Sequence, residues 1–163
     1  MKKWDKLADE KAIERTVVAL KANGIDAFVV KDGDEAKRKV FEILPEGAEV
    51  MIMSSVTLDT IGISKNIESG KFNSVRKKLM SMDNATQGAE KRKLGAAPEW
   101  AIGSAHAVTQ DGHVLIASNS GSQLPAYAYG ACHVIWVVGS QKIVENVEGG
   151  IKRIYDYTLP LED

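Results

Sequence analysis

Two polar segments of the chain carry residues that could bind a negatively charged ligand. The segment "SSVTLDTIG" (54–62) follows the apolar run "EVMIM", and the segment Ser118–Gln123, "SNSGSQ", follows "HVLIA". Hydroxyl groups and backbone N–H groups at helix starts suit phosphates and carboxylates, and Gly121 would let the backbone approach a ligand without a Cβ in the way. Serine and threonine are also good helix N-caps. The pattern therefore leaves two interpretations open, helix capping or an anion-binding cleft.

The sequence argues against nucleotide loops and metal sites. Neither G-x-x-x-x-G-K-[ST] nor G-x-G-x-x-G occurs, so the common phosphate-loop and dinucleotide fingerprints are missing. Cys132 is the single cysteine, which excludes an intramolecular disulfide, a metal site built from cysteines and an iron–sulfur cluster of the chain's own. The histidines, His106, His113 and His133, do not have the spacing of metal ligands. We therefore expect neither a metal nor a cofactor.

Three residues are candidates for acid–base catalysis. His106 and Asp111 lie on either side of a predicted hairpin turn, close enough to meet, and Glu99 offers a further carboxyl group. Ser120 and Ser122 lack the G-x-S-x-G context of an activated serine. We expect Cys132, beside the apolar run "HVIWVV", to be a buried small side chain.

The composition is that of an ordinary globular protein. The chain has 163 residues, 44% hydrophobic and 26% charged, and its 21 basic and 22 acidic residues give a net charge of −1. This balance gives no electrostatic reason to expect nucleic acid or an anionic membrane as a partner. The longest apolar runs are too short to cross a bilayer, and the first residues lack the apolar region of a secretion signal. We therefore expect a cytoplasmic protein.

The order of the expected elements predicts an α/β fold. They are a helix over 6–23, a strand over 25–31, a helix over 32–44, a strand over 48–55, mostly helical structure over 57–82 with a break at Gly70, a hairpin about 110–112, a short helix over 124–131, a strand over 133–140 and a helix over 146–157. Strand, helix and strand in succession predict a parallel sheet. In such a sheet ligands collect at the carboxyl ends of the strands, where we expect both polar segments. No linker or repeat interrupts the chain, so we expect one domain over 1–163.

The region between Ser74 and Lys93 is rich in charge, with "RKK" at 76–78 and "EKRK" at 90–93. Such runs are typical of a solvated helix face. The alternative is that these cations close over an anionic ligand.

The C-terminal part of the sequence resembles the LUD-domain family, which contains lactate-utilisation protein C. The series "VTQDG…ASNSGSQL…VVGSQKIV" carries the resemblance over about 99–162, and "MSSVTLDTIGI" looks like the family's upstream serine/threonine loop. The family's fold is similar to that of ribose-5-phosphate isomerase, glucosamine-6-phosphate deaminase and the CoA-transferases. The resemblance thus implies a three-layer α/β/α Rossmann-like domain with a mostly parallel central sheet.

The resemblance also implies a ligand site and a function. The ligand-binding residues that it implies are Ser54, Ser55, Thr57, Ser118, Asn119, Ser120, Gly121, Ser122 and Gln123. Where related CoA-transferases place an attacking glutamate, this chain has Asn119 or Ser120, so the likeness does not extend to CoA transfer. The implied function is that of an accessory component in the oxidation of lactate to pyruvate, binding a small anionic metabolite and relying on iron–sulfur partner subunits. Alternatives are a stand-alone enzyme or a metabolite sensor for a phosphorylated or CoA-linked ligand, and self-association is plausible for the superfamily.

Overall fold

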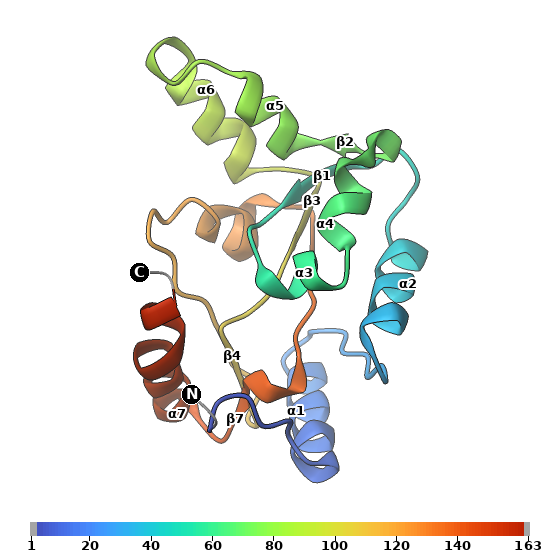
Figure 1. Ribbon diagram of the computed structural model, residues 1–163, viewed down its shortest axis with the longest axis vertical. Helices are drawn as coiled ribbons and strands as arrows, with labels where there is room; N and C mark the ends of the chain where they lie inside the picture. Colours follow the sequence, from blue (N-terminus) through green and yellow to red (C-terminus); the bar gives the residue numbers. More distant parts are fainter. Residues whose placement is uncertain (1–2, 162–163) are drawn as a thin grey trace. The chain divides into compact units, whose positions relative to one another are not determined.

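The computed structural model describes residues 3–161, which form two compact units (Figure 1). The first unit contains residues 3–30, 105–117 and 138–161, and the second contains residues 31–104 and 118–137. The chain therefore passes between the units four times, after residues 30, 104, 117 and 137. That residues 1–163 act as one domain stays a prediction.

The second unit is built on a parallel sheet of four strands. The strands are β2 (Asn73–Ser74), β1 (Glu49–Ile52), β3 (Trp100–Gly103) and β6 (His133–Trp136), in that order across the sheet. The register pairs Val50 with Trp100 and Trp100 with His133. The predicted parallel sheet is thus confirmed.

Helices cover both faces of this sheet. Successive side chains of a strand point to opposite faces, and here both faces carry apolar side chains. On one face, Val50 and Ile52 pack against α2 (Gly33–Ile43), α3 (Val56–Thr60) and α4 (Ile63–Asn66) (Figure 1). The buried core on this face consists of Val40, Leu44, Ala48, Val50, Ile52, Leu58, Ile63, Ile67, Trp100 and Ile102.

On the other face, Met53 and Ala101 pack against η2 (Ala126–Gly130), a single π-helical turn. The second unit therefore has the α/β/α layering of a Rossmann-like fold, as expected.

The start of α2 follows directly from its sequence. The Asp32 carboxylate accepts a hydrogen bond from the Glu35 N–H at 2.9 Å, and the Glu35 carboxylate accepts one from the Lys31 N–H at 2.8 Å. The arrangement differs from a capping box in that Glu35 accepts from the residue before the N-cap and not from the N-cap itself, and it satisfies two backbone donors at the helix start.

We expect Asp32→Ala to lower the free energy of unfolding by about 1 kcal/mol, because the cap on the Glu35 N–H is lost. Asp34→Ala is the matched control, since it removes the same charge from the first turn of the same helix. Urea denaturation of both variants measures the effect. An equal loss in the two variants would show that helix-end charge, and not the cap, stabilises α2.

The charge-rich region forms two helices, α5 (Val75–Ser81) and α6 (Asn84–Ala96), after the π-helical turn η1 (Ile67–Lys71) and β2. Gly70 breaks the helical path with φ of 103°, as predicted. Lys78 pairs with Glu49 at 3.5 Å, and the Lys91 ammonium donates to the Met82 carbonyl at 3.2 Å. These contacts with the protein's own groups favour the solvated-face interpretation.

The first unit holds a smaller sheet of three strands. Its central strand is β4 (Ala107–Thr109), which pairs antiparallel with β5 (Val114–Leu115) and parallel with β7 (Ile143–Val144). The β4–β5 pair is the predicted hairpin, and the Gly112 N–H closes its turn on the Thr109 carbonyl at 3.0 Å.

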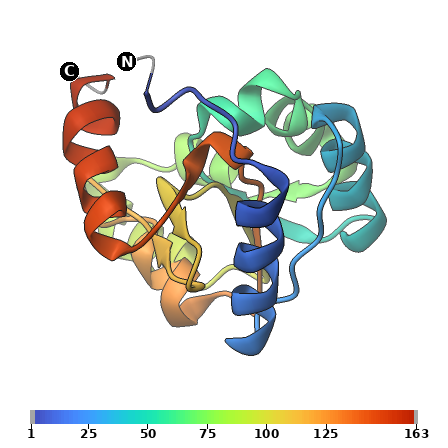
Figure 2. The ribbon, with the colours of Figure 1, turned by 90° about the horizontal axis from the view of Figure 1, so that it is seen from below.

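Two helices flank this small sheet. They are α1 (Glu10–Ala22) and α7 (Val147–Arg153), which lie on either side of it in Figure 2. The end of α7 continues through the π-helical turn η4 (Ile154–Thr158) into η5 (Leu159–Leu161), and the short η3 (Ser140–Lys142) leads into β7. The helices predicted over 6–23 and 146–157 are confirmed, although α1 begins only after its N-cap, Asp9.

Two predictions about apolar segments are wrong. Residues 25–30 form no regular element, and Phe28 and Val29 are 60% and 62% exposed. The preference of such residues for strands reflects packing on a pleated, half-buried surface and not an intrinsic backbone preference. The strand β6 is an edge strand whose residues are only partly buried, because just one neighbour covers it, and Cys132 before it is exposed instead of buried.

Candidate functional site

The first polar segment lies at the carboxyl end of β1. The Met53 N–H continues the sheet by donating to the Ile102 carbonyl at 2.8 Å, and Ser54 and Ser55 follow immediately. The Ser55 hydroxyl accepts from the Leu58 N–H at 3.5 Å and caps α3, whereas the Ser54 side chain is exposed. Capping thus accounts for Ser55, and Ser54 remains available to a ligand.

The strand order creates a switch point at this edge of the sheet. From β1 the chain goes to β2 on one side, and from β3 it goes to β6 on the other. Where connections diverge in this way, the loops part outside the carboxyl ends of the two strands and ligands bind there. The first polar segment and Gly103, the last residue of β3, both lie at this point.

The second polar segment is a tight turn that enters the second unit ahead of η2. The Ser118 hydroxyl accepts from the Gly121 N–H at 3.0 Å, and the Ser120 hydroxyl donates to that of Ser122 at 2.9 Å. Gly121 has φ of 71°, and nothing lies within 4 Å of where its Cβ would be. The segment does not end a strand of the four-stranded sheet, as its position in the sequence suggested; it begins the approach to η2.

Apolar contacts bring the two polar segments toward the same edge. Met53, which precedes Ser54, forms a cluster with Ala126 and Tyr127, which follow Gln123 closely in the chain. Met53 and η2 thus pack together, whereas the gathering of the two polar segments at one sheet edge and their roles in binding stay predictions.

Tyr127 is a site residue that sequence reasoning missed. Its hydroxyl occupies the space over Gly103: a Cβ there would lie 1.5 Å from the Tyr127 hydroxyl oxygen and 3.3 Å from the Met53 Cβ. Its ring meets that of Trp136 edge to face at 5.6 Å. Burial raises the pKa of the Tyr127 hydroxyl far above its usual value, so the group stays neutral and can donate a hydrogen bond.

A second donor lies at the same edge. Trp136 ends β6 in register with Gly103, and its indole Nε1 is buried without a hydrogen-bond partner among the described residues. A buried donor left unpaired costs free energy, which a bound acceptor would recover. Gly103 lies far from Tyr127 and Trp136 in the sequence, and only the folded chain brings the three together.

The three catalytic candidates belong to different units of the chain. Glu99 precedes β3 at the amino end of the sheet, where its carbonyl accepts from the His133 N–H at 3.0 Å. His106 lies in the first unit, where its Nδ1 accepts from the N–H of Ala117, the residue before the second polar segment, at 3.2 Å. A catalytic role for these residues stays a prediction.

Asp111 pairs within the hairpin turn instead of with His106. Its carboxylate accepts from the Thr109 hydroxyl and lies 3.1 Å from His113 Nδ1. The hydrogen bond from Thr109, with that from His113, lowers the pKa of the Asp111 carboxyl below its usual value. An exposed carboxylate with a lowered pKa is a poor proton donor or acceptor near neutrality.

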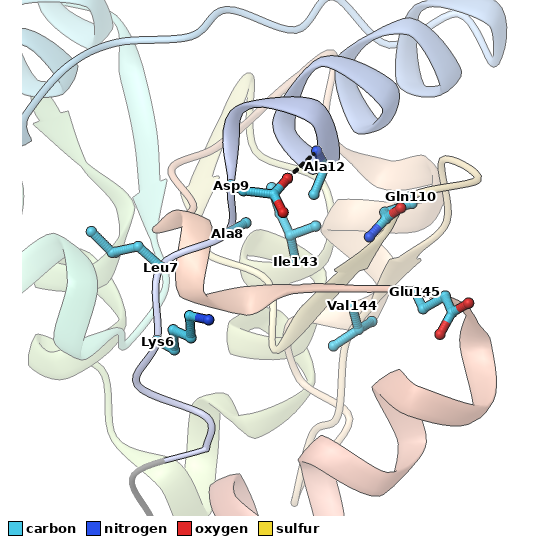
Figure 3. A pocket seen from close by; sticks show the side chains of 9 residues that line it. All are labelled: Lys6, Leu7, Ala8, Asp9, Ala12, Gln110, Ile143, Val144 and Glu145. Carbon is cyan, nitrogen blue, oxygen red and sulfur yellow. Dashed lines mark hydrogen bonds between the residues drawn. The ribbon is translucent and has the colours of Figure 1, made fainter.

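A surface cavity of about 290 Å³ in the first unit contains none of these candidates. Figure 3 shows it between the N-terminal segment and β7, with Asp9, Gln110 and Glu145 among its polar residues. The Asp9 carboxylate caps α1 by accepting from the Ala12 N–H at 2.8 Å, and the Gln110 side chain accepts from Arg15 at 3.1 Å. These polar groups already serve the fold, so we do not place the function here.

Residues 3–161 contain no group of three or more His, Cys, Asp or Glu side chains placed to hold a metal ion. No helix in this part of the chain has both the length and the apolar character needed to span a membrane.

Comparison with known proteins identifies the family. The model of the LUD domain matches residues 13–161, nearly the whole chain. No curated protein matches the sequence, and no solved structure does. The LUD domain is associated with lactate utilisation proteins. With its parallel sheet and its serine-rich segments, this chain belongs to the LUD-domain family.

Proposed function

We propose that the chain binds a small carboxylate, of the lactate or pyruvate type, as an accessory component of organic-acid oxidation. The observation that carries the proposal is the packing at the switch point of the second unit, where Met53, directly before the first polar segment, contacts Ala126 and Tyr127, which follow the second, beside Gly103. Family membership supports the choice of organic acids.

The chemistry of the donors favours a singly charged ligand. The donors that we assign to the ligand are neutral: the hydroxyls of Ser54 and Ser120, the phenol of Tyr127 and the indole N–H of Trp136. Neutral donors can match one carboxylate by hydrogen bonding, whereas a phosphate ester with nearly two charges is usually met by arginine or lysine. A monocarboxylate is therefore the first candidate.

The proposal assigns the redox step to a partner. Oxidation of lactate to pyruvate removes two electrons and two protons, and a chain with one cysteine cannot ligate an iron–sulfur cluster by itself. In this proposal the chain holds the organic acid, and a partner subunit carrying such a cluster accepts the electrons.

A second candidate is a sensor or stand-alone enzyme for a phosphorylated or CoA-linked ligand. It is favoured by the open backbone at Gly121, where a bulky oxyanion could approach the chain without meeting a side chain. Self-association and a cytoplasmic location stay predictions for either candidate.

Isothermal titration tests the first candidate. We expect saturable binding of L-lactate or pyruvate, weakened about tenfold or more by Ser120→Ala and by Tyr127→Phe, since each variant loses a hydrogen bond to a charged group. Ser81→Ala is the control, because Ser81 is an exposed serine on α5 whose hydroxyl donates to the Lys78 carbonyl at 2.8 Å.

The titration also separates the alternatives. Binding of a sugar phosphate or an acyl-CoA, but not of lactate or pyruvate, would transfer support to the second candidate. Equal affinity in all the variants would remove the site from this edge of the sheet.

A further inference from the structure

Arg153 is a buried cation without a direct carboxylate partner in the described part of the chain. The residue is only 3% exposed, although it carries a permanent charge. Its Nη1 donates to the His106 carbonyl and, at 3.4 Å, to the Thr158 hydroxyl, while its Nε has no hydrogen-bond partner among the described residues. No carboxylate of residues 3–161 forms an ion pair with it. Buried charges are normally paired, so this guanidinium is an exception that needs an explanation.

Asp5 is the carboxylate that acts electrostatically on Arg153, and it forms no ion pair with the guanidinium. The guanidinium lies over the Tyr157 ring, 5.0 Å from its centroid, and the Tyr157 hydroxyl donates to the Asp5 carboxylate at 2.6 Å. The carboxylate of Asp5 is thus bound by the phenol and not by the arginine. Its attraction offsets only part of the charge on Arg153.

A second cation, Lys142, lies in the same part of the first unit. It directly precedes β7, whose Ile143 is in register with Val108 of β4. One residue earlier, Lys142 therefore lies beside Ala107, the neighbour of His106. Adjacent strands are about 4.8 Å apart, so Lys142 lies close to the carbonyl that receives Arg153.

The helix that covers Ala107 is α7, the helix that carries Arg153. A Cβ on Gly150 of α7 would lie 3.4 Å from the Ala107 Cβ, and Arg153 is three residues further along the same helix. Burial, and then the charge of Arg153, lower the pKa of the Lys142 ammonium to about 8. The charged group that acts on Lys142 is thus Arg153 from α7, and Arg153 is in turn acted on by Tyr157 from η4 and by Asp5, which is bonded to Tyr157.

We propose that Lys142 and Arg153 form an oxyanion-binding site in the first unit, which takes a carboxylate or phosphate group. An arginine fork and a lysine ammonium are the donors that proteins use for such groups, and the orphaned Nε of Arg153 is the donor that the anion would satisfy. The bound anion would offset the repulsion between the like charges of Lys142 and Arg153. The inference is independent of the proposed function, whose residues all belong to the second unit.

Titration with inorganic phosphate and with L-lactate tests the site. We expect both anions to bind saturably to the unmodified chain at pH 7 and constant ionic strength. Calorimetry measures the binding of each anion, and the ³¹P line width gives a second measure for phosphate. Lys142→Met should weaken the binding at least tenfold, and Lys142→Arg should retain it. Lys152→Met is the matched control. It removes the same charge at an exposed lysine one residue before Arg153.

The pH dependence provides a second readout that needs no substitution. Binding to the unmodified chain should weaken as pH rises above about 8, where the Lys142 ammonium loses its proton. The proposal is overturned if neither anion binds saturably, if Lys142→Met binds as tightly as the unmodified chain, or if Lys152→Met has the same effect as Lys142→Met.

The variants distinguish this site from the proposed function. Ser120→Ala should leave the Lys142-dependent part of phosphate binding unchanged, since Ser120 lies in the second unit. If lactate binding is weakened by Ser120→Ala and no anion's binding is weakened by Lys142→Met, the proposed function is supported and the oxyanion site is overturned. If Lys142→Met weakens anion binding and Ser120→Ala does not weaken lactate binding, the oxyanion site is supported and the proposed function is overturned.

Discussion

Gly130→Ala is expected to lower the free energy of unfolding by about 3 kcal/mol or more. A Cβ at this position would lie 1.8 Å from the Ala96 carbonyl oxygen and 3.1 Å from that of Pro125. Both atoms belong to the backbone, so relief requires η2 to move away from the end of α6. Overpacking of a well-packed site costs about 1–3 kcal/mol even where side chains can adjust, and backbone adjusts less readily. Chemical denaturation measures the loss.

Gly88→Ala is the matched control for this substitution. Gly88 lies inside α6, and the nearest atom to its added Cβ would be a guanidinium nitrogen of Arg92 at 3.7 Å. Alanine is the better helix former, so this variant should gain up to about 1 kcal/mol. A Gly130→Ala variant as stable as the unmodified chain would mean that η2 does not pack closely on the end of α6.

The free energy of unfolding should rise by about 2 kcal/mol between pH 8 and pH 10 because of Lys142. Burial and the charge of Arg153 lower the pKa of Lys142 from 10.5 to about 8. Between these values the unfolded chain binds a proton that the folded chain does not, so stability increases with pH. The cost of burying the ammonium is present below pH 8 and disappears as pH rises through this window. Guanidinium denaturation at several pH values, in a buffer without phosphate, measures the slope.

Lys142→Met should remove this rise, while Lys152→Met should keep it. Above about pH 10 the slope reverses, because the raised pKa of Tyr127 keeps its phenol neutral in the folded chain while the unfolded chain loses that proton. A stability that stays flat from pH 8 to pH 10 in the unmodified chain would show that Lys142 is hydrated and unperturbed.

Local patterns predicted most of the elements. The helices over 10–22 and 33–43 begin at Asp9 and Asp32, whose side chains cap them, and the run around Val50 forms a buried strand because both sheet faces are covered. Asp-Gly at 111–112 predicted the hairpin turn through the positive φ that Gly112 adopts. Each of these signals acts over a few residues, which is why the sequence alone reveals them.

Features that depend on distant residues were not predictable. Residues 25–30 have the composition of a strand, but composition does not show whether another strand supplies backbone partners. Tyr127 joins the candidate site only because Gly103, 24 positions earlier in the sequence, leaves space for its hydroxyl. The segments around Ser54 and Ser120 were identified from the sequence, whereas the aromatic pair beside them required the structure.

The four passages of the chain between the units determine the order in which a nascent protein can complete them. Residue 137 supplies the end of the second unit, so that unit has all its strands while residues 138–161 are still being translated. The first unit has α1 by then but lacks β7 and α7 until residues 138–161 leave the ribosome. Since neither unit is a continuous stretch, no single cut in the gene separates them. The first unit is therefore completed after the second.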